Sequence, residues 1–372
     1  MEFVDLKSQY KKLKTEIDAN IQKVLNHGHY LMGPEVAELE QQLAEYVGVK
    51  NCITCANGTD ALHMVLMAWG IKKGDAVFVP TFTFMSTAEV VSLAGATPVF
   101  TDIDLKTFNM DAASLEKQIE KVIAEGKLKP KAVIPVDLFG QPADYSKILP
   151  VAKKYNLLVL EDGAQGFGGD INGKKACSFG DAATTSFFPA KPLGCYGDGG
   201  AIFTDDDKLA ELLVSIRIHG KGKEKYDNVR IGLNSRLDTI QAAILLPKLK
   251  AFKDYELLKR NEVAAVYTKG LKEKYVTPTV LHGFTSSWAQ YTLLLDNAQQ
   301  RTELQAKLKD AGVPSMVYYP KCLHQQTCYA ELGYKTGDLP NAERASQGVL
   351  SLPMSPWIKK EEQEKVIEIL LR

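Results

Sequence analysis

The sequence has no surplus of charge of either sign and no long apolar run. Its 372 residues carry 45 basic and 45 acidic side chains, for a formal net charge of zero. Composition therefore points to neither nucleic acid nor an anionic membrane as a partner. No apolar run approaches the ~20 residues of a transmembrane helix, and residues 1–5 lack the basic and apolar regions of a signal peptide. We therefore expect a cytoplasmic protein.

Cysteine is scarce and is not clustered. The six cysteines are spread along the chain, as is typical of reduced thiols in a cytosolic protein of this size. Cys52 and Cys55 form a C-x-x-C pattern, but no second pair lies at the spacing of a zinc site. His27 and His29 flank Gly28 at the expected end of a helix, and no cluster of carboxylates or cysteines accompanies them. The sequence therefore predicts no metal site.

Apolar strands and helical segments alternate from about residue 50 onward. Strands are expected near 52–55, 76–79, 97–101, 131–136 and 157–161. Helical segments near 59–69, 84–94, 111–124 and 144–155 separate them. This alternation predicts an α/β fold with a large, mostly parallel sheet covered by helices.

A long helical pattern divides the chain. It begins near Leu237, is expected to bend at Pro247 and runs to about residue 269. We expect it to connect a large domain, residues 1–248, with a smaller C-terminal α/β domain, residues 249–372. The smaller domain shows a strand pattern near 288–295 and helical patterns near 301–311 and 360–371.

Three of the predicted strands are followed by residues that suit ligand binding. Gly58 and Thr59 open a helix, where free N–H groups bind phosphate readily; simple helix capping is the alternative. Phe84 either stacks on a planar ring or packs in the core. Asp162 follows a buried run and either pairs with a buried cation or caps a turn. Ligands of such sheets bind beyond the carboxyl ends of the strands, so these residues are expected to lie together.

Lys191 lies in a turn between Pro189 and Pro192, after a short strand that ends near Ser186. A partly desolvated lysine loses part of its preference for the ammonium form, and its free amine can form a Schiff base with a carbonyl group. Taken alone, Lys191 is better explained as one solvated lysine among many. Together with a phosphate site, an aromatic ring and a carboxylate, it completes the set of groups that pyridoxal phosphate requires.

The motifs resemble those of the DegT/DnrJ/EryC1/StrS sugar aminotransferases over nearly the whole chain. The resemblance is closest to the subgroup that aminates C3 of UDP-2-acetamido-2-deoxy-3-oxo-glucuronate for bacterial O-antigen sugars. It implies the type I fold of PLP-dependent transferases, like that of aspartate aminotransferase. The matching stretches are residues 5–7, 33–36, 57–62, 80–84, 161–165, 186–191, 234–238 and 319–320.

The resemblance implies a role for each residue that surrounds the cofactor. Lys191 carries pyridoxal 5'-phosphate as a Schiff base and later moves the proton. Asp162 pairs with the ring nitrogen, and Gln165 approaches the ring hydroxyl. Phe84 stacks on the ring. The residues implied to hold the phosphate are Gly58, Thr59 and Ser186.

The resemblance also implies a homodimer with shared active sites. Asn234 reaches the phosphate of the neighbouring subunit's cofactor. Arg236 contacts the sugar across the interface, where a planar guanidinium suits a carboxylate, and Tyr319 also binds the substrate. Glutamate is the implied amino donor and a nucleotide keto-sugar the acceptor.

Two positions depart from the family pattern: the first affects backbone freedom, and only the second bears on the substrate. Gly163 stands where alanine is frequent, and Tyr318 stands where the family usually has histidine. Amination of another 3-keto or a 4-keto nucleotide sugar stays an alternative, as does a PLP-binding regulator without turnover. Dehydratases of the same fold carry histidine in place of the lysine, so Lys191 argues against them. The basic loop 217–225 either helps to hold the nucleotide diphosphate or is a solvated loop.

Overall fold

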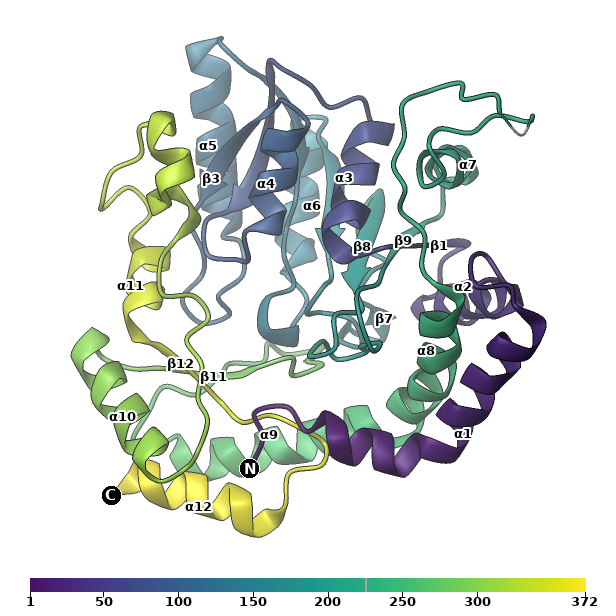
Figure 1. The fold of residues 1–372 in the computed structure, drawn as a ribbon. Coiled ribbons are helices and arrows are strands. Elements are labelled where there is room, and N and C mark those ends of the chain that lie inside the picture. Colours follow the sequence, from purple (N-terminus) through teal and green to yellow (C-terminus); the bar gives the residue numbers. More distant parts are fainter. Residues whose placement is uncertain (225) are drawn as a thin grey trace.

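A seven-stranded, mostly parallel sheet forms the centre of the computed structural model, which describes residues 1–224 and 226–372 (Figure 1). The strand order is β1-β9-β8-β5-β4-β2-β3, and β8, β5, β4, β2 and β3 run parallel to one another. β9 runs antiparallel to both of its neighbours. The strands are β1 (Asn51–Cys55), β2 (Asp75–Pro80), β3 (Thr97–Thr101), β4 (Lys129–Val133), β5 (Leu158–Asp162), β8 (Ala182–Ser186) and β9 (Gly200–Thr204).

Helices cover both faces of this sheet, because the buried strand residues alternate between two apolar clusters. In β2, Val77 and Val79 belong to one cluster and Phe78 to the other. The first cluster is closed by α3 (Gly58–Ala68), α4 (Ser86–Leu93) and α7 (Asp207–Ile216). The second is closed by α5 (Ala112–Glu125) and α6 (Tyr145–Lys154). The α/β architecture expected from the sequence is therefore confirmed.

A helical layer connects the sheet to the C-terminal part of the chain (Figure 1). It consists of α1 (Leu6–His27), α2 (Pro34–Val47), α8 (Thr239–Ala251) and α9 (Leu257–Leu271). Gly28 ends α1 in a left-handed conformation, as the sequence suggested. A π-helical turn, Phe252–Glu256, joins α8 to α9. The bend was expected at Pro247, and the irregularity lies about one turn beyond that residue.

The C-terminal lobe has an apolar core of its own. The core contains Val263, Tyr291, Leu308, Leu352 and Val366 among others. The lobe is built from β11 (Tyr291–Leu294), β12 (Val349–Leu352), α10 (Ala298–Asp310), α11 (Pro340–Gly348) and α12 (Lys360–Leu371). The predicted boundary after residue 248 lies within α8, and the division into two domains stays a prediction.

Several short elements were not expected from the sequence. They are β9 in the main sheet, α11 and β12 in the C-terminal lobe, and the three-stranded sheet of β6 (Asp170–Ile171), β7 (Lys174–Lys175) and β10 (Phe284–Thr285). Of the basic loop 217–225, Lys225 lies outside the described residues. No helix in the described part of the chain is both long and apolar enough to cross a membrane.

Candidate active site

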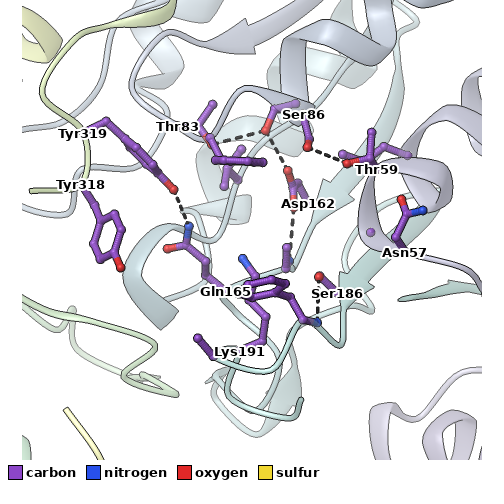
Figure 2. Close-up of a pocket in the computed structure, with 18 of the residues that line it drawn as sticks. Asn57, Thr59, Thr83, Ser86, Asp162, Gln165, Ser186, Lys191, Tyr318 and Tyr319 are labelled. Carbon is purple, nitrogen blue, oxygen red and sulfur yellow. Dashed lines mark hydrogen bonds between the residues drawn. The ribbon is translucent and has the colours of Figure 1, made fainter. Parts of the chain in front are cut away.

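A cavity of about 470 Å³ lies at the carboxyl ends of the parallel strands. Eight of the ten site residues predicted from the sequence line it, and Figure 2 shows several of them around one space. The eight are Gly58, Thr59, Phe84, Asp162, Gln165, Ser186, Lys191 and Tyr319. The strand ends therefore bring together residues that are more than 250 positions apart in the chain, although their individual roles stay predictions.

Asp162, the last residue of β5, is buried and held in place by two hydrogen bonds. Its Oδ2 accepts a hydrogen bond from the Thr87 hydroxyl at 2.8 Å, and its Oδ1 accepts one from the backbone N–H of Ala164 at 3.2 Å. Burial raises the pKa of this carboxyl group, whereas the hydrogen bond from Thr87 and the charge of Lys191 lower it. A fixed carboxylate in a buried site is suited to pairing with a cation.

The amine of Lys191 is available for reaction. Its Nζ makes no hydrogen bond or ion pair with any residue that the structure describes, and burial lowers its pKa while the charge of Asp162 raises it. The backbone around it is tightly turned, since the N–H of Lys191 donates to the carbonyl of Phe188 at 2.8 Å and that of Cys195 to Phe187 at 2.7 Å. A tight turn thus presents a lysine whose pKa is lowered by burial.

The start of α3 forms the opposite end of the cavity. Asn57 caps the helix by accepting a hydrogen bond from the N–H of Asp60 at 2.8 Å, whereas the first N–H groups of a helix have no partner within it. The Thr59 hydroxyl contacts the Ser86 hydroxyl at 2.7 Å. A side chain at position 58 would place its Cβ 2.7 Å from that of Ser186, so glycine is needed for this close approach. The cap therefore leaves other N–H groups of the first turn free, which suits an anion.

Two phenylalanine rings are exposed at the cavity. Phe84 is 55% exposed and Phe188 is 51% exposed, although both line the cavity. The alternative that Phe84 packs in the core is therefore wrong. Its ring lies 6.4 Å from that of Tyr319, centroid to centroid. An apolar ring left uncovered beside a polar site is suited to stacking on a planar ligand.

Gln165 and Tyr319 connect the sheet to the C-terminal lobe. The Gln165 Oε1 accepts a hydrogen bond from the N–H of Phe139 at 2.8 Å, and its Nε2 donates to the Tyr319 hydroxyl at 3.2 Å (Figure 2). Burial raises the pKa of Tyr319, so its hydroxyl stays protonated. This pair gives the cavity a neutral polar wall.

Asn234 and Arg236 are the two predicted site residues that do not line the cavity, among the described parts of the chain. The Arg236 guanidinium donates to the Asn234 Oδ1 at 2.6 Å. Both were expected to act in the neighbouring subunit's site, and that expectation stays a prediction.

The cavity also contains residues that sequence analysis missed. They include Asn57, Thr83, Ser86, Thr87, Phe188, Asp198, Gln290 and Tyr318. Ser86 and Thr87 open α4, the helix that follows β2, and a hydroxyl residue at the start of such a helix is the signal that identified Thr59. Gln290 carries no such signal, because it lies just before a strand of the C-terminal lobe.

This set of groups fits pyridoxal 5'-phosphate. The unpaired amine of Lys191, the fixed carboxylate of Asp162 and the exposed ring of Phe84 correspond to its aldehyde, ring nitrogen and ring face. The start of α3 and the hydroxyl of Ser186 suit the phosphate. The Ser186 oxygen accepts a hydrogen bond from the N–H of Phe188 at 3.2 Å, which leaves its hydroxyl hydrogen free to donate.

Comparison with known proteins gives consistent matches along the chain. The model of the DegT/DnrJ/EryC1/StrS aminotransferase family matches residues 11–371. A UDP-2-acetamido-2-deoxy-3-oxo-D-glucuronate aminotransferase of Pseudomonas aeruginosa is 50% identical over 96% of each chain. A pleiotropic regulatory protein of Geobacillus stearothermophilus is 46% identical over 98% of this chain and 96% of its own.

Solved structures match equally well. A DegT DnrJ EryC1 StrS aminotransferase from Brucella abortus has a TM-score of 0.97 and 49% identity, and covers 100% of this chain and 98% of its own. The NtdA protein of Bacillus subtilis, solved with bound cofactor PMP, has a TM-score of 0.87 and 30% identity over 99% of this chain and 82% of its own.

Proposed function

Because this chain belongs to the DegT/DnrJ/EryC1/StrS aminotransferase family, we propose that it moves an amino group from glutamate to C3 of UDP-2-acetamido-2-deoxy-3-oxo-glucuronate. The chain is a nucleotide-sugar aminotransferase, and its cofactor is pyridoxal 5'-phosphate. The identity to the Pseudomonas aeruginosa enzyme supports this particular sugar. We further propose that the enzyme is a cytoplasmic homodimer and that its product enters a surface polysaccharide.

The observation that carries the proposal is the presence of an unpaired lysine, Lys191, and a buried carboxylate, Asp162, in one cavity. The amine has no partner among the described residues, while the carboxylate is held by Thr87 and Ala164. A structural lysine in a buried site would be expected to have an ion-pair or hydrogen-bond partner. An unpaired amine whose pKa is lowered by burial is instead suited to chemistry.

Each protein group has a distinct task in such a transfer. Pyridoxal phosphate, when bound, supplies a carbonyl group that exchanges with amines and a ring that accepts the electron pair released when a proton leaves the neighbouring carbon. Lys191 would hold the cofactor through its Nζ, and its free amine would take and return that proton. Asp162 keeps the ring nitrogen protonated, because Thr87 fixes its carboxylate in place.

The remaining groups orient the reactants. The start of α3 and Ser186 would hold the phosphate, and Phe84 would cover a ring face. Gln165 is held by Phe139 and Tyr319, so its amide can approach the ring hydroxyl without losing orientation. The same site would serve both half-reactions, first with glutamate and then with the keto-sugar.

A visible spectrum of the purified protein before and after glutamate tests the proposal. Lysine-bound pyridoxal gives a yellow band, and glutamate should replace it with the band of pyridoxamine phosphate. Addition of the UDP-3-oxo-uronate should restore the yellow band and give an aminated sugar detectable by mass spectrometry. Lys191→Ala should lose about 10²–10⁴-fold in turnover, whereas Lys117→Ala, on the exposed face of α5, should be unchanged. Normal turnover by Lys191→Ala would overturn the assignment.

The same measurement separates the alternatives. A protein that turns yellow with pyridoxal phosphate but does not respond to glutamate or any other amino donor would be a cofactor-binding regulator. Restoration of the yellow band by another 3-keto or a 4-keto nucleotide sugar, but not by the 3-oxo-uronate, would keep the reaction class and change the substrate.

A further inference from the structure

Two buried carboxyl groups lie against each other beside the turn that carries Asp162 and Gln165. Asp137 and Glu161 are both 0% exposed, and a hydrogen bond joins their side chains. An ionised carboxylate only accepts hydrogen bonds, so one of the two groups must carry a proton. Two carboxylates in one buried site do not both ionise, because like charges repel strongly there. This carboxyl pair, Asp137 and Glu161, is therefore expected to hold one proton at neutral pH.

The hydrogen bonds of Glu161 identify it as the ionised member of the carboxyl pair. Its Oε1 accepts a hydrogen bond from the backbone N–H of Cys177, and its Oε2 accepts one from the backbone N–H of Phe179. Both oxygens of Glu161 thus face backbone donors, which cannot become acceptors. Hydrogen bonds of this kind favour the charged form of a carboxyl group.

Asp137 has one oxygen available for the proton. Its Oδ1 accepts hydrogen bonds from the N–H of Ala143 and from the hydroxyl of Tyr145, both at 2.9 Å. Its Oδ2 is fully covered and has no donor among the described residues. Such an oxygen is costly to bury as part of a carboxylate, but it is satisfied as an O–H group that donates to Glu161. The proton therefore belongs on the Oδ2 of Asp137.

The surroundings of the carboxyl pair favour retention of its proton. Burial raises the pKa of the Tyr145 hydroxyl and of the Cys177 thiol, so both are neutral at pH 7. Burial also raises the pKa of Glu161, whereas its hydrogen bonds and the charge of exposed Lys174 lower it. Burial and the charge of Glu161 raise the pKa of Asp137 well above its usual range. These directions agree with the proton position that the hydrogen bonds indicate.

The turn after β5 packs directly on Asp137. A Cβ on Gly166 would lie 2.5 Å from the Oδ2 of Asp137, and one on Gly163 would lie 3.8 Å from the same oxygen. The N–H of Asp137 also donates to the carbonyl of Asp162 at 3.0 Å. Because Asp162 is itself acidic, a second charge on the carboxyl pair would add repulsion at this turn. A shift of the pair would therefore move Asp162 and Gln165 together.

We infer that Asp137 donates a retained proton to ionised Glu161, and that this carboxyl pair positions the turn from which Asp162 and Gln165 face the cavity. The positioning role rests on the proposed function, which assigns these two residues to the cofactor. The retained proton rests on the contacts of the pair alone. Asp137 and Glu161 do not line the cavity, so they act through the residues that they hold in place.

Asp137→Asn tests the retained proton. The amide matches the protonated acid, since its oxygen can accept from Ala143 and Tyr145 while its NH2 group donates to Glu161. The wild type keeps a proton that the unfolded chain releases near pH ~4, so its folding weakens as the pH rises, whereas the variant has no such proton. Urea unfolding of the holoenzymes should show the folding equilibrium constant of the variant, relative to the wild type, rising about tenfold per pH unit and per subunit between about pH 5.5 and about pH 7.5. A ratio that does not change with pH would overturn the inference.

Glu161→Gln tests which carboxyl group carries the proton. A glutamine here must turn its NH2 group toward the N–H of Cys177 or of Phe179, which leaves that donor unpaired. At about pH 7 the folding equilibrium constant should therefore fall about 5–150-fold, whereas that of Asp137→Asn should not fall. The opposite order, with Glu161→Gln tolerated and Asp137→Asn damaging, would place the proton on Glu161 and contradict the inference.

Cofactor affinity tests the positioning role. The Kd for pyridoxal phosphate should rise at least about fivefold in Glu161→Gln, because one buried donor beside the turn is left unpaired. Asp102 provides a matched control: its two oxygens also accept backbone N–H groups, from Asn341 at 3.0 Å and Ala342 at 2.8 Å, but it does not line the cavity or the turn. Asp102→Asn should lose stability and leave the Kd within about twofold. Normal affinity in Glu161→Gln, or an equal loss in Asp102→Asn, would rule out the positioning role.

Asp137→Ala keeps this test decisive if Glu161→Gln is too unstable to purify. It removes the group on which Gly166 packs, so the Kd for pyridoxal phosphate should rise here as well, and an unchanged Kd would again rule out the positioning role. If the wild type itself binds no pyridoxal phosphate, the proposed function and the positioning role fail together. The retained proton is then still decided by the pH dependence of unfolding, which requires no activity.

Discussion

Asp162 depends on a single side-chain donor, the hydroxyl of Thr87. This hydrogen bond joins the first turn of α4 to the end of β5, across 75 positions of sequence. The hydroxyl stabilises the ionised carboxylate, since hydrogen bonds to the charged form lower a pKa. The ring nitrogen of the cofactor would therefore be kept protonated through a residue that does not touch it.

Thr87→Val tests this positioning role. Removal of the donor should raise the pKa of Asp162 and lower kcat/KM by about 10–100-fold, the value of a hydrogen bond to a charged group. The pH at which the bound cofactor's absorbance changes should move with it, which a merely structural role would not produce. Thr87→Ser keeps the hydroxyl and should stay close to the wild type. A pH profile that is identical in Thr87→Val would contradict the role.

The sequence predicted those site residues that belong to a local pattern, but not those that reach the site only through contacts between distant segments. Strand ends and local motifs located Lys191 and Asp162, because these residues follow strand and turn patterns that are visible in the chain itself. Neither the hydroxyl of Thr87 nor the amide of Gln290 belongs to such a pattern. Each acquires its place only when separate elements pack together, as when Phe139 binds both Gln165 and Gln290.

At the scale of elements, the start of α3 is positioned by how closely it approaches β8. Asn57 caps the helix, and Gly58 allows its first turn to lie against Ser186. Together these contacts aim the first N–H groups of the helix into the cavity. An anion bound there also benefits from the positive end of the helix dipole.

Gly58→Ala should therefore weaken cofactor binding. The added Cβ would lie 2.7 Å from that of Ser186, so the helix start or the strand end must move. Overpacking of this kind costs about 1–3 kcal/mol, which corresponds to a rise of about 5–150-fold in Kd for pyridoxal phosphate. This Kd can be measured by titrating the cofactor-free protein with pyridoxal phosphate and following the absorbance. In a Ser186→Gly background the same substitution should lose most of its effect; a full effect there would rule out this contact as the cause.

A second contact between elements ties the C-terminal part of the chain to the end of β2. The ring Nδ1 of His324 lies 2.7 Å from the Thr81 hydroxyl, and its Nε2 lies 3.2 Å from Glu343 in α11. The N–H of Leu323 also donates to the carbonyl of Thr81 at 2.8 Å. Thr81 precedes Phe84 by three positions, so this buried contact supports the strand end that carries the exposed ring.

This contact should weaken in mild acid. Burial lowers the pKa of His324 below 6.5, although Glu343 opposes the shift. The unfolded chain therefore binds a proton that the folded chain excludes, and the free energy of unfolding falls as pH drops below about 6.5. The variant His324→Asn has no titrating group at this position, so only the wild type loses stability here as the pH falls. The difference in free energy of unfolding between the two proteins, measured with urea, should therefore be smaller at about pH 5.5 than at about pH 7.5. Half-buried His63, whose pKa is also lowered by desolvation, is present in both proteins, so its contribution cancels in this comparison. A constant deficit would contradict the prediction.

The elements that the sequence did not predict are short or weakly apolar. β9 begins Gly200–Ala201, and neither residue carries a strand preference; the strand is held by pairing with β1 and β8. The strands β6, β7 and β10 have two residues each, too few for any periodicity. α11 is short and polar, so its helical period is hard to detect. Long helices and the parallel strands gave clear periods and were predicted within a few residues.

At the scale of the whole molecule, a single chain leaves Asn234 and Arg236 outside its own cavity. Asn234 is exposed, and the Arg236 Nε is buried without a partner among the described residues. Large apolar side chains are exposed near this segment. Ile231 is 86% exposed, and Leu31, which pairs with Asp238, is 47% exposed. Exposed apolar groups of this kind are typical of a surface that another chain covers, which supports the proposed homodimer.

Mixed dimers can establish whether one subunit completes the other's site. Lys191→Ala and Arg236→Ala should each be inactive as pure proteins. In a heterodimer of the two, one site combines both defects, while the other has Lys191 from one chain and Arg236 from its partner. Random association of an equal mixture makes about half of the dimers heterodimers, and one of the two sites in each heterodimer is intact. Refolding such a mixture should therefore restore about a quarter of wild-type activity. If Arg236 acted within its own chain, every site would carry one defect and the mixture would stay inactive. Recovery of activity therefore requires a shared site.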